Sequence, residues 1–370
     1  MLRRMNEAKS HTIVLASGGT GGHIFPAEAL AEALRERGWR VELITDRRFE
    51  NYGGALKNHP YHILRSSIVG GGFVKKLRGV VNLTLSYFQA RALLAKIRPE
   101  AVVGFGGYPS FPTMLAAVHK KFPTVIHEQN SLLGRANYVL ARKVNAIATS
   151  FPEVSGIEES DMPKVMLIGN PVRPAVKALR NMEYPRFTDA GVLKILVTGG
   201  SQGASVFGRV LPEALKLLSE EKRRRIRIDQ QCRPADIEEV RKAYAEMGAS
   251  ADLATFFNDI PARLATSHLV IARAGASTIA ELAVAGRPAV LVPYPHAKDD
   301  HQTANANALE DAGGGWLMPE EAFTPAALAA KLESFLALPD TLNEAAAKAR
   351  SVGNPDADVK LAEVVERVIA

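Results

Sequence analysis

A histidine closes a glycine-rich stretch near the start of the chain, and this combination could move a proton beside a bound anion. The stretch "SGGTGGHIFP" runs from Ser17 to Pro26 and contains His23. Imidazole is the side chain best suited to accept a proton near neutral pH. The glycines separate an apolar run from a helix-forming run, and a strand-to-helix turn of this kind offers free N–H groups and a helix dipole to an anion. Ile24 stands where the dinucleotide fingerprint needs a small residue, and the turn lacks the lysine of a P-loop.

Three more loops of small residues follow along the chain. They are "GFGGYPS" (104–110), "GGSQGAS" (199–205) and "RAGASTIAE" (273–281). In the last, the N–H groups of Ala276 to Thr278 could hold phosphate oxygens, and Glu281 could accept hydrogen bonds from both hydroxyls of a ribose. A plain tight turn at the first loop and a solvated glutamate at the last are the structural alternatives.

Two polar stretches add groups for proton transfer or sugar binding. "HEQN" (127–130) closes a predicted strand and is expected to point four polar side chains into one cleft. Glu128 is an alternative base to His23, and Tyr108 is another. Gln302 and Asn305, three residues apart on a predicted helix, present amides that suit sugar hydroxyls.

No metal site is expected. The stretch "HAKDDHQ" (296–302) lacks the paired histidines of a helical zinc site. Asp356 and Asp358 precede or begin a helix, where acidic residues offset the dipole.

Strand-like and helix-like segments alternate along the chain, which predicts parallel sheets with helices on both faces. In the first half the predicted strands are Thr12–Ala16, Arg40–Thr45, Ala101–Gly104, Thr124–His127 and Asn145–Thr149. In the second half they are Val192–Thr198, Arg225–Gln231, Asp252–Phe256, His268–Ala272 and Pro288–Pro293. The proline-containing stretch "GNPVRPAV" (169–176) is expected to link two doubly wound domains, with the loops at the carboxyl ends of their strands, where ligands bind.

Composition sets the broad class. The chain has 370 residues, 47% of them hydrophobic, and a net charge of +7, which suits acidic partners such as phosphates or an anionic membrane surface. The single cysteine excludes an internal disulfide, so a reducing compartment is expected. "KRRRIR" (222–227) has no aromatic platform for bases, so a solvated face is expected there and no nucleic acid.

A mixed apolar and basic segment at 68–88 could touch a membrane surface. No stretch is long and apolar enough to span a bilayer, and the chain's start lacks the long apolar run of a signal peptide. Attachment would therefore be peripheral and reversible. The alternative is a helix packed on the sheet, with a basic loop. The candidate membrane residues are Phe73, Val74, Lys75, Lys76, Leu77 and Arg78.

These stretches, with "IGNPVRP" and "VTGGSQGAS", resemble the family 28 glycosyltransferases of peptidoglycan synthesis over nearly the whole chain. The resemblance implies a GT-B fold of two Rossmann-like domains. Residues 1–173, with a final helix at 353–370 crossing back, would take the lipid acceptor, and residues 174–352 would hold the nucleotide sugar. It implies inverting, metal-independent transfer of N-acetylglucosamine from UDP-GlcNAc to the C4 hydroxyl of undecaprenyl-diphospho-MurNAc-pentapeptide, without a cofactor.

The resemblance also implies a location and a set of binding residues. The chain would act at the cytoplasmic face of the membrane, where other cell-wall synthesis and division proteins are expected as partners. The acceptor diphosphate would lie against Gly21, Gly22, Gly106 and Gly107. With Asn305 added from the amide pair, the expected UDP-GlcNAc contacts are Thr20, Gly21, Gly22, Asn130, Arg173, Ser201, Phe257, Ala276, Ser277, Thr278, Ile279, Ala280, Glu281 and Gln302.

Two other functions fit the same architecture. A UDP-GlcNAc 2-epimerase would act on the nucleotide sugar without a lipid acceptor. A non-catalytic subunit would bind UDP-GlcNAc without turning it over. The segment at 68–88 favours the transferase over both.

Overall fold

A computed structural model describes residues 11–18, 21–52, 54–64, 73–200, 203–297 and 300–370, except for the side chains of 51–52 and 73–78. The chain forms two compact units. Unit 1 comprises Met1–Pro171 and Asp356–Ala370, and unit 2 comprises Val172–Pro355. The division falls inside the proline-containing stretch, two residues before the expected boundary at 173.

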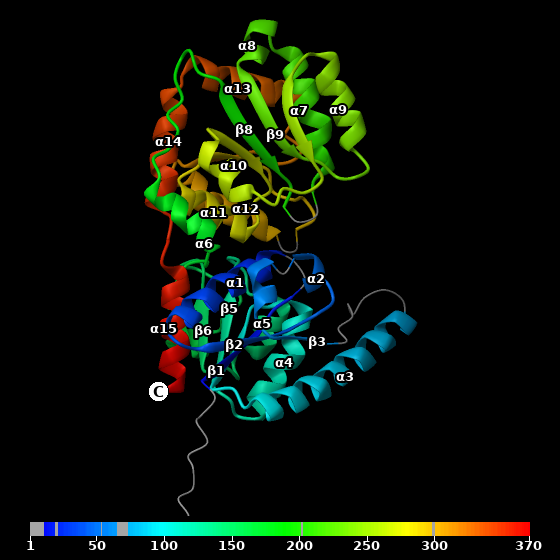
Figure 1. Cartoon of the computed structure of the whole chain (residues 1–370), viewed down its shortest axis with the longest axis vertical. Helices are drawn as coiled ribbons and strands as arrows, with labels where there is room; N and C mark the ends of the chain where they lie inside the picture. Colours follow the sequence, from blue (N-terminus) through cyan, green and yellow to red (C-terminus); the bar gives the residue numbers. More distant parts are fainter. Residues whose placement is uncertain (1–10, 19–20, 53, 65–72, 201–202, 298–299) are drawn as a thin grey trace, which may run out of the picture. The chain divides into compact units, whose positions relative to one another are not determined.

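Unit 1 is built on a parallel sheet of seven strands in the order β3-β2-β1-β4-β5-β6-β7 (Figure 1). The strands are β1 Thr12–Ala16, β2 Arg40–Thr45, β3 Tyr61–Ile63, β4 Ala101–Gly104, β5 Thr124–Glu128, β6 Ala146–Thr149 and β7 Val165–Leu167. Alternate residues of β1 enter two different cores, Ile13 and Leu15 on one face and Val14 and Ala16 on the other. Burial on both faces explains why these strands read as continuous apolar runs.

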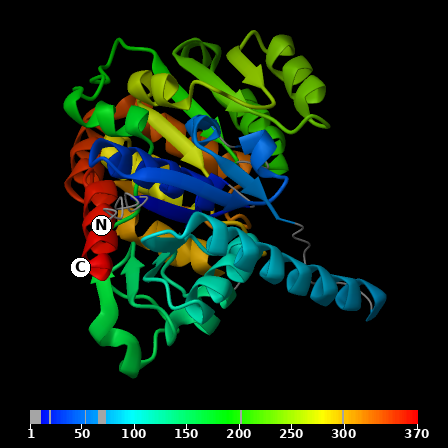
Figure 2. The ribbon, with the colours of Figure 1, turned by 60° about the horizontal axis from the view of Figure 1, so that its bottom comes forward.

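Helices cover both faces of the unit 1 sheet. They are α1 Gly21–Glu36, α2 Phe49–Tyr52, α3 Phe73–Ile97, α4 Gly107–His119, α5 Arg135–Ala141 and α15 Ala357–Ile369, with 3-10 turns η1 Gly54–Asn58 and η2 Glu159–Lys164. The C-terminal helix α15 returns to unit 1, where Leu361 and Val365 join the core that holds Ile13. At its end, Glu366 accepts hydrogen bonds from Arg37 at 2.6 Å and from the Trp39 indole at 3.0 Å. Figure 2 shows α3 projecting beyond the rest of unit 1.

Unit 2 repeats the design with a parallel sheet of six strands in the order β10-β9-β8-β11-β12-β13. The strands are β8 Leu193–Thr198, β9 Ile226–Gln231, β10 Ser250–Ala254, β11 Leu269–Ala272, β12 Ala289–Leu291 and β13 Gly315–Leu317. The helices are α6 Pro174–Lys177, α7 Ser205–Leu217, α8 Glu220–Arg224, α9 Ile237–Glu246, α10 Ile260–Thr266, α11 Ala276–Ala285, α12 His301–Glu310, α13 Pro325–Ala337 and α14 Asp340–Ser351, with the 3-10 turn η3 Ala178–Asn181. The predicted fold of two parallel-sheet α/β domains is confirmed.

A buried arginine ties two helix ends of unit 2 together. Arg287 is 1% exposed and donates to the carbonyls of Leu264, at 2.5 Å, and Ala285, at 2.7 Å. These carbonyls belong to α10 and α11, whose last turns would otherwise leave acceptors without partners. Burial lowers the pKa of Arg287 to about 10, which leaves the guanidinium charged at neutral pH. The end of α11 is thus anchored independently of its beginning.

The expected strands are present, but three further strands were not predicted. The missed strands are β3, β7 and β13, each of three residues at a sheet edge. An edge strand pairs on one side only and needs no continuous apolar run, so its sequence signal is weak. The expected strand Asp252–Phe256 lies at Ser250–Ala254, where parallel pairing with β9 sets its register.

Candidate functional site

Two glycine-containing turns of unit 1 meet at His23, in the first turn of α1. Gly106 and Gly107 have φ of 81° and 75°, the left-handed region that favours glycine. A Cβ on Gly107 would lie 3.3 Å from His23 Nε2, and one on Gly106 would lie 3.6 Å from His23 Cε1. The backbone conformation therefore favours glycine at both positions, and at Gly107 a side chain would also crowd the ring.

The start of α4 leaves its first N–H groups without side-chain caps. Its N-cap, Gly106, provides no side-chain hydrogen bond, and no acidic residue stands in the first turn. The first turn of α1 likewise contains no acidic residue. Helix starts of this kind attract anions, so the surroundings of Gly21, Gly22 and Gly107 suit a diphosphate. The predicted contact at Thr20 lies outside the described residues.

The His23 ring is half-buried and held from one side by Gln129. His23 Nδ1 lies 2.9 Å from Gln129 Oε1. Burial is the main influence on the ring and lowers its pKa, while the hydrogen bond to Gln129 and the charge of Glu128 oppose that shift. The net lowering keeps His23 neutral at neutral pH, the form that can accept a proton.

Glu128 organises the loop after β5 and is not placed to act as a base. It is 2% exposed. Its carboxylate accepts from the backbone N–H groups of Asn130 and Gly134 and from the side-chain amides of Asn130 and Asn137, at 2.9–3.2 Å. Four donors occupy the acceptor capacity of both oxygens, so Glu128 as an alternative base is corrected to a structural role.

The expectation that all four side chains of "HEQN" enter one cleft is also wrong. His127 is 0% exposed and Gln129 is 2% exposed, so with Glu128 they form a buried polar cluster. Only Asn130 is partly exposed, and its predicted ligand contact stays a prediction. Tyr108 is 41% exposed in the first turn of α4, and its role as an alternative base stays a prediction.

In unit 2 a bidentate ion pair lies one turn into α11. Arg173 Nε and Nη2 donate to the two carboxylate oxygens of Glu281 at 2.8 and 3.0 Å. Glu281 is 8% exposed, so the alternative of a solvated glutamate is wrong. Each carboxylate oxygen keeps a second lone pair that a ribose hydroxyl could use. Arg173 thus fixes the orientation of the carboxylate that is predicted to hold the ribose.

The start of α11 supplies the anion-binding part of this second site. Its N-cap, Gly275, provides no side-chain hydrogen bond, and no acidic residue stands in the first turn. Ser277, Thr278 and Ala280 are half-buried, whereas Ala276 and Ile279 are buried. The backbone N–H groups of the first turn therefore remain the natural phosphate contacts.

The two residues of the predicted amide pair, Asn305 and Gln302, have different surroundings. Asn305 is 0% exposed and donates to the Ala274 carbonyl at 3.2 Å, which holds the loop before α11. Its predicted sugar contact is therefore replaced by a supporting role. Gln302 is half-buried and its Oε1 accepts from the Tyr294 N–H at 2.9 Å, which leaves its NH₂ to reach a sugar.

Phe257 is less accessible than a uracil contact would need. It is 5% exposed, and the Arg263 guanidinium lies 3.8 Å from its ring centroid. Arg263 is held by Asp229, Asp252 and Asp259 at 3.1, 2.7 and 2.9 Å. The predicted uracil contact at Phe257 stays a prediction. The predicted contact at Ser201 and the side chains of 73–78 lie outside the described residues.

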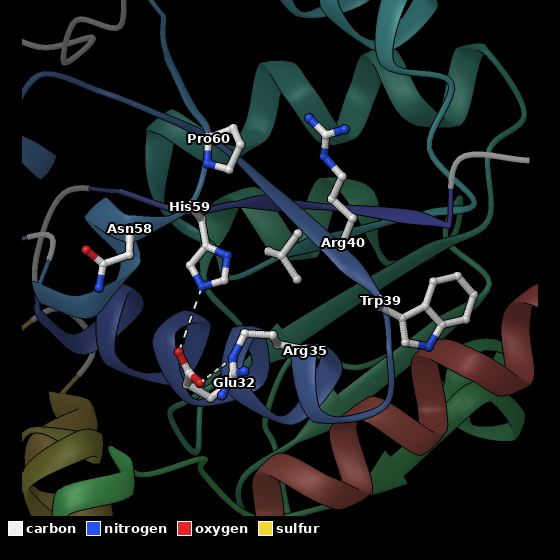
Figure 3. Close-up of a pocket in the computed structure, with 8 residues that line it drawn as sticks. Glu32, Arg35, Trp39, Arg40, Asn58, His59 and Pro60 are labelled. Atoms are coloured by element: carbon white, nitrogen blue, oxygen red, sulfur yellow. Dashed lines mark hydrogen bonds and ion pairs between the residues drawn. The ribbon is translucent and has the colours of Figure 1, made fainter.

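A surface pocket of about 420 Å³ lies at the other end of the unit 1 strands (Figure 3). Its lining residues are Glu32, Arg35, Trp39, Arg40, Val41, Asn58, His59 and Pro60. It opens beside Arg40, where β2 begins, whereas the glycine turns follow the strand carboxyl ends. Glu32 pairs with Arg35 at 2.9 Å and approaches His59 at 3.9 Å, so much of the pocket's charge is balanced internally.

The sequence did not reveal that Gln129 and Arg173 hold other side chains of the site in place. Gln129 follows His127 by two residues, and in extended backbone this spacing places both side chains on one face. That periodicity was a usable signal. The partner of Arg173 lies 108 positions away, and no local pattern reveals such a pair.

Comparison with known proteins gives matches over both units. Residues 13–149 match the glycosyltransferase family 28 N-terminal domain, and residues 194–361 match the glycosyltransferase family 28 C-terminal domain. A Rhodospirillum centenum protein is 54% identical over 353 residues, which cover 95% of this chain and 93% of that protein. A Zymomonas mobilis protein is 48% identical and covers 97% of this chain and 93% of its own length. Both are named UDP-N-acetylglucosamine--N-acetylmuramyl-(pentapeptide) pyrophosphoryl-undecaprenol N-acetylglucosamine transferase.

Solved structures agree with these matches. The crystal structure of Acinetobacter baumannii MurG has a TM-score of 0.75 at 30% identity and covers 96% of this chain and 99% of its own. A UDP-GlcNAc 2-epimerase from Neisseria meningitidis has a TM-score of 0.65 at 13% identity and covers 96% of this chain and 100% of its own. The second likeness shows a shared fold alone.

Proposed function

The chain belongs to glycosyltransferase family 28, and on this premise we propose how its residues transfer N-acetylglucosamine from UDP-GlcNAc to N-acetylmuramyl-(pentapeptide)-pyrophosphoryl-undecaprenol. The product is the lipid-linked disaccharide of peptidoglycan synthesis. Relatives with 46–54% identity over at least 95% of this chain are named for this activity, whereas the epimerase likeness is one of fold. The epimerase and the non-catalytic subunit are therefore not favoured.

Unit 1 takes the acceptor and activates it. The observation that carries this assignment is the meeting of both glycine turns at His23, 3.3 Å from the Cβ position of Gly107. A diphosphate held by the N–H groups of α1 and α4 would bring the attached muramoyl sugar beside the imidazole. The C4 hydroxyl loses its proton to His23 as its oxygen bonds to the anomeric carbon. The bond from that carbon to the UDP oxygen breaks with inversion.

Unit 2 holds the donor and stabilises the departing UDP. The Arg173–Glu281 pair presents a fixed carboxylate to the ribose, and the N–H groups at the start of α11 face the diphosphate. Donors fixed in advance stabilise charge as it develops without having to reorganise. Gln302 directs its NH₂ to the N-acetylglucosamine, where the acetamido carbonyl can accept it.

One assay tests this function. Purified protein is supplied with UDP-GlcNAc and a lipid-linked muramoyl acceptor, and the lipid-linked disaccharide is sought by mass spectrometry. We expect disaccharide and UDP in equal amounts, with turnover retained in excess chelator. Epimerised UDP-sugar without disaccharide, or binding without turnover, would overturn the proposal. Loss of turnover in chelator that magnesium restores would overturn metal independence.

We further propose that α3 attaches the protein to an anionic membrane surface at the cytoplasmic face. Val81, Leu85 and Phe88 follow each other by four and three residues and are 49%, 47% and 59% exposed, so they form one apolar stripe. Among the described residues, no helix is long and apolar enough to cross a membrane. A stripe of this kind suits peripheral insertion, and the basic residues before it suit acidic lipid.

Vesicle sedimentation tests the attachment. Because burying an apolar side chain of this size contributes about 1.5–3 kcal/mol, Phe88→Asp should weaken binding to phosphatidylglycerol-containing vesicles about tenfold or more. Leu217→Asp, at a residue 60% exposed on α7, is the matched control and should bind as the unmodified protein does. Equal binding by both variants would refute the assignment to α3.

A further inference from the structure

We propose that Gln129 is a positioning residue that locks His23 as the tautomer with its proton on Nδ1, leaving Nε2 as the proton acceptor. This inference rests on the proposed role of His23 as the base. It concerns three side chains, His127, Gln129 and His23, which form a row of hydrogen bonds in unit 1; His127 and Gln129 are buried and His23 is half-buried.

The orientation of the Gln129 amide is set by a backbone carbonyl. Gln129 Nε2 lies 3.0 Å from the carbonyl oxygen of His127. A carbonyl can only accept, so the amide nitrogen must face it. Gln129 Oε1 therefore faces His23 Nδ1 at 2.9 Å, and an amide oxygen can only accept as well. The hydrogen between these two atoms must come from His23 Nδ1.

The hydrogen bonds of His127, at the other end of this row of side chains, require the same orientation of the Gln129 amide. Gln129 Nε2 also lies 3.0 Å from His127 Nδ1, which must accept, so the proton of neutral His127 is on Nε2. His127 Nε2 in turn faces the Gly169 carbonyl at 3.3 Å. It also faces Ser150 Oγ at 3.2 Å, whose own hydrogen goes to the Glu128 carbonyl at 2.9 Å. Both partners of His127 Nε2 therefore accept, as this tautomer requires.

Burial makes it costly to reverse the donors and acceptors in this row of hydrogen bonds. His127 is 0% exposed and Gln129 is 2% exposed, so water cannot replace a lost partner. Burial lowers the pKa of His127 to about 4, which keeps it neutral and keeps its Nδ1 an acceptor across the working pH range. Reversing the His23 tautomer would set the lone pair of Nδ1 against the Gln129 oxygen.

The second ring nitrogen of His23, Nε2, lies where the acceptor is expected. His23 Nε2 and Cδ2 both lie 3.3 Å from the Cβ position of Gly107, beside the start of α4. The charged groups that act on the ring are Glu128, which favours its protonated form, and Arg48, which opposes it; the Phe105 backbone also favours protonation by a hydrogen bond. Once His23 has taken the proton, the imidazolium keeps its Gln129 contact, so the row of hydrogen bonds serves both charge states.

Tautomers can be read directly, without catalysis. Protein labelled with ¹⁵N-histidine is examined by long-range ¹H–¹⁵N correlation at about pH 8, above the ordinary pKa of imidazole, and His23 is assigned by its loss in His23→Ala. We expect His23 Nδ1 protonated and Nε2 bare. Gln129→Met should turn this signal into a tautomer mixture, whereas Ser17→Ala, which removes only the 2.8 Å bond to the His23 carbonyl, should not. A protonated Nε2 in the unmodified protein, or an unchanged tautomer in Gln129→Met, would overturn the proposal.

Turnover distinguishes positioning from general structural support. Gln129→Met should lower kcat by about 10- to 100-fold, the loss seen when the hydrogen-bond partner that orients a metal-binding histidine is removed. Gln129→Glu keeps an acceptor for Nδ1 and adds a negative charge, so it should recover most of that loss and move the acid limb of kcat/KM to higher pH. Equal loss in both variants would indicate structural damage and count against positioning. If His23→Ala retains turnover while the tautomer is found as described, the base assignment fails and the row of hydrogen bonds stands.

Discussion

The two units share a plan but surround their helix starts with different kinds of side chain. In unit 1 the turn at Gly106 and Gly107 packs against His23, a ring that can change its charge and that is held by Gln129, which is itself bonded to neutral His127. In unit 2 the start of α11 is backed by an ion pair. Glu281, on α11, is held by Arg173 through hydrogen bonds of 2.8 and 3.0 Å. A neutral ring in a polar pocket suits proton transfer, whereas a bidentate ion pair suits a fixed contact to a bound hydroxyl.

The comparison shows that a parallel sheet supplies the same backbone device twice, and that the side chains behind it decide its use. Both helix starts lack side-chain caps and acidic first turns, so each can hold a phosphate. In unit 1 His23, from the first turn of α1, packs beside the start of α4, whereas the first turn of α11 contains no histidine. Proton transfer is thus proposed for unit 1 and donor binding for unit 2, and variants that impair one without the other test this division.

The largest expected effect is on turnover in unit 1. His23→Ala should lower kcat by about 10²–10⁴-fold, the span for a lost general base. UDP-GlcNAc affinity, measured by calorimetry, should stay within about twofold, because the groups proposed to hold its ribose and diphosphate, the Arg173–Glu281 pair and the start of α11, lie in unit 2. His119→Ala, at an exposed histidine bonded to Tyr87, is the control and should retain kcat. A loss of kcat below about tenfold in folded His23→Ala would remove His23 as the base.

A smaller effect is expected on donor affinity in unit 2. Glu281→Gln should raise the Kd for UDP-GlcNAc about 10- to 100-fold, because hydrogen bonds to a charged group contribute about 1.5–3 kcal/mol. At saturating donor, kcat should change far less than in His23→Ala. Glu213→Gln on α7, an exposed partner of Lys216, is the matched control. Unchanged donor affinity in Glu281→Gln would show that the ribose lies elsewhere.

The smallest effect concerns recognition of the sugar. UDP-GlcNAc should raise Tm more than UDP-glucose does at saturation, because Tyr294 holds the Gln302 oxygen at 2.9 Å and the Gln302 NH₂ can then donate to the acetamido carbonyl, which glucose lacks. Gln302→Ala should shrink this difference by severalfold in relative Kd, as loss of one neutral hydrogen bond of about 0.5–1.5 kcal/mol implies. Equal Tm shifts from both nucleotide sugars in the unmodified protein would contradict the assignment.

The fold was largely predictable, and the site only in part. Buried strands such as Thr12–Ala16 can be predicted from the sequence because the residues on both faces are apolar. The edge strand Tyr61–Ile63 does not need that pattern. The glycine turns were visible because left-handed backbone and close approach leave few substitutes for Gly106 and Gly107.

What a side chain does inside the site depended on distant partners. The sequence predicts Glu128 as an alternative base, but in the fold its carboxylate accepts four hydrogen bonds, one of them from Asn137. Asn305 looked like a sugar contact, but its neighbours bury it completely. Sequence spacing predicts which face a residue occupies, yet not whether another segment already fills its hydrogen-bonding capacity.

The pH dependence of kcat/KM for the lipid-linked acceptor tests the central claim most directly, because it reports the base of the free enzyme. Burial lowers the pKa of His23 below its ordinary value of 6.5, and only the neutral ring accepts a proton. Activity should therefore persist as the pH falls to 6.5, decline only below it, and show no such decline in the residual activity of His23→Ala. A decline centred above 6.5, or the same decline in His23→Ala, would contradict the account.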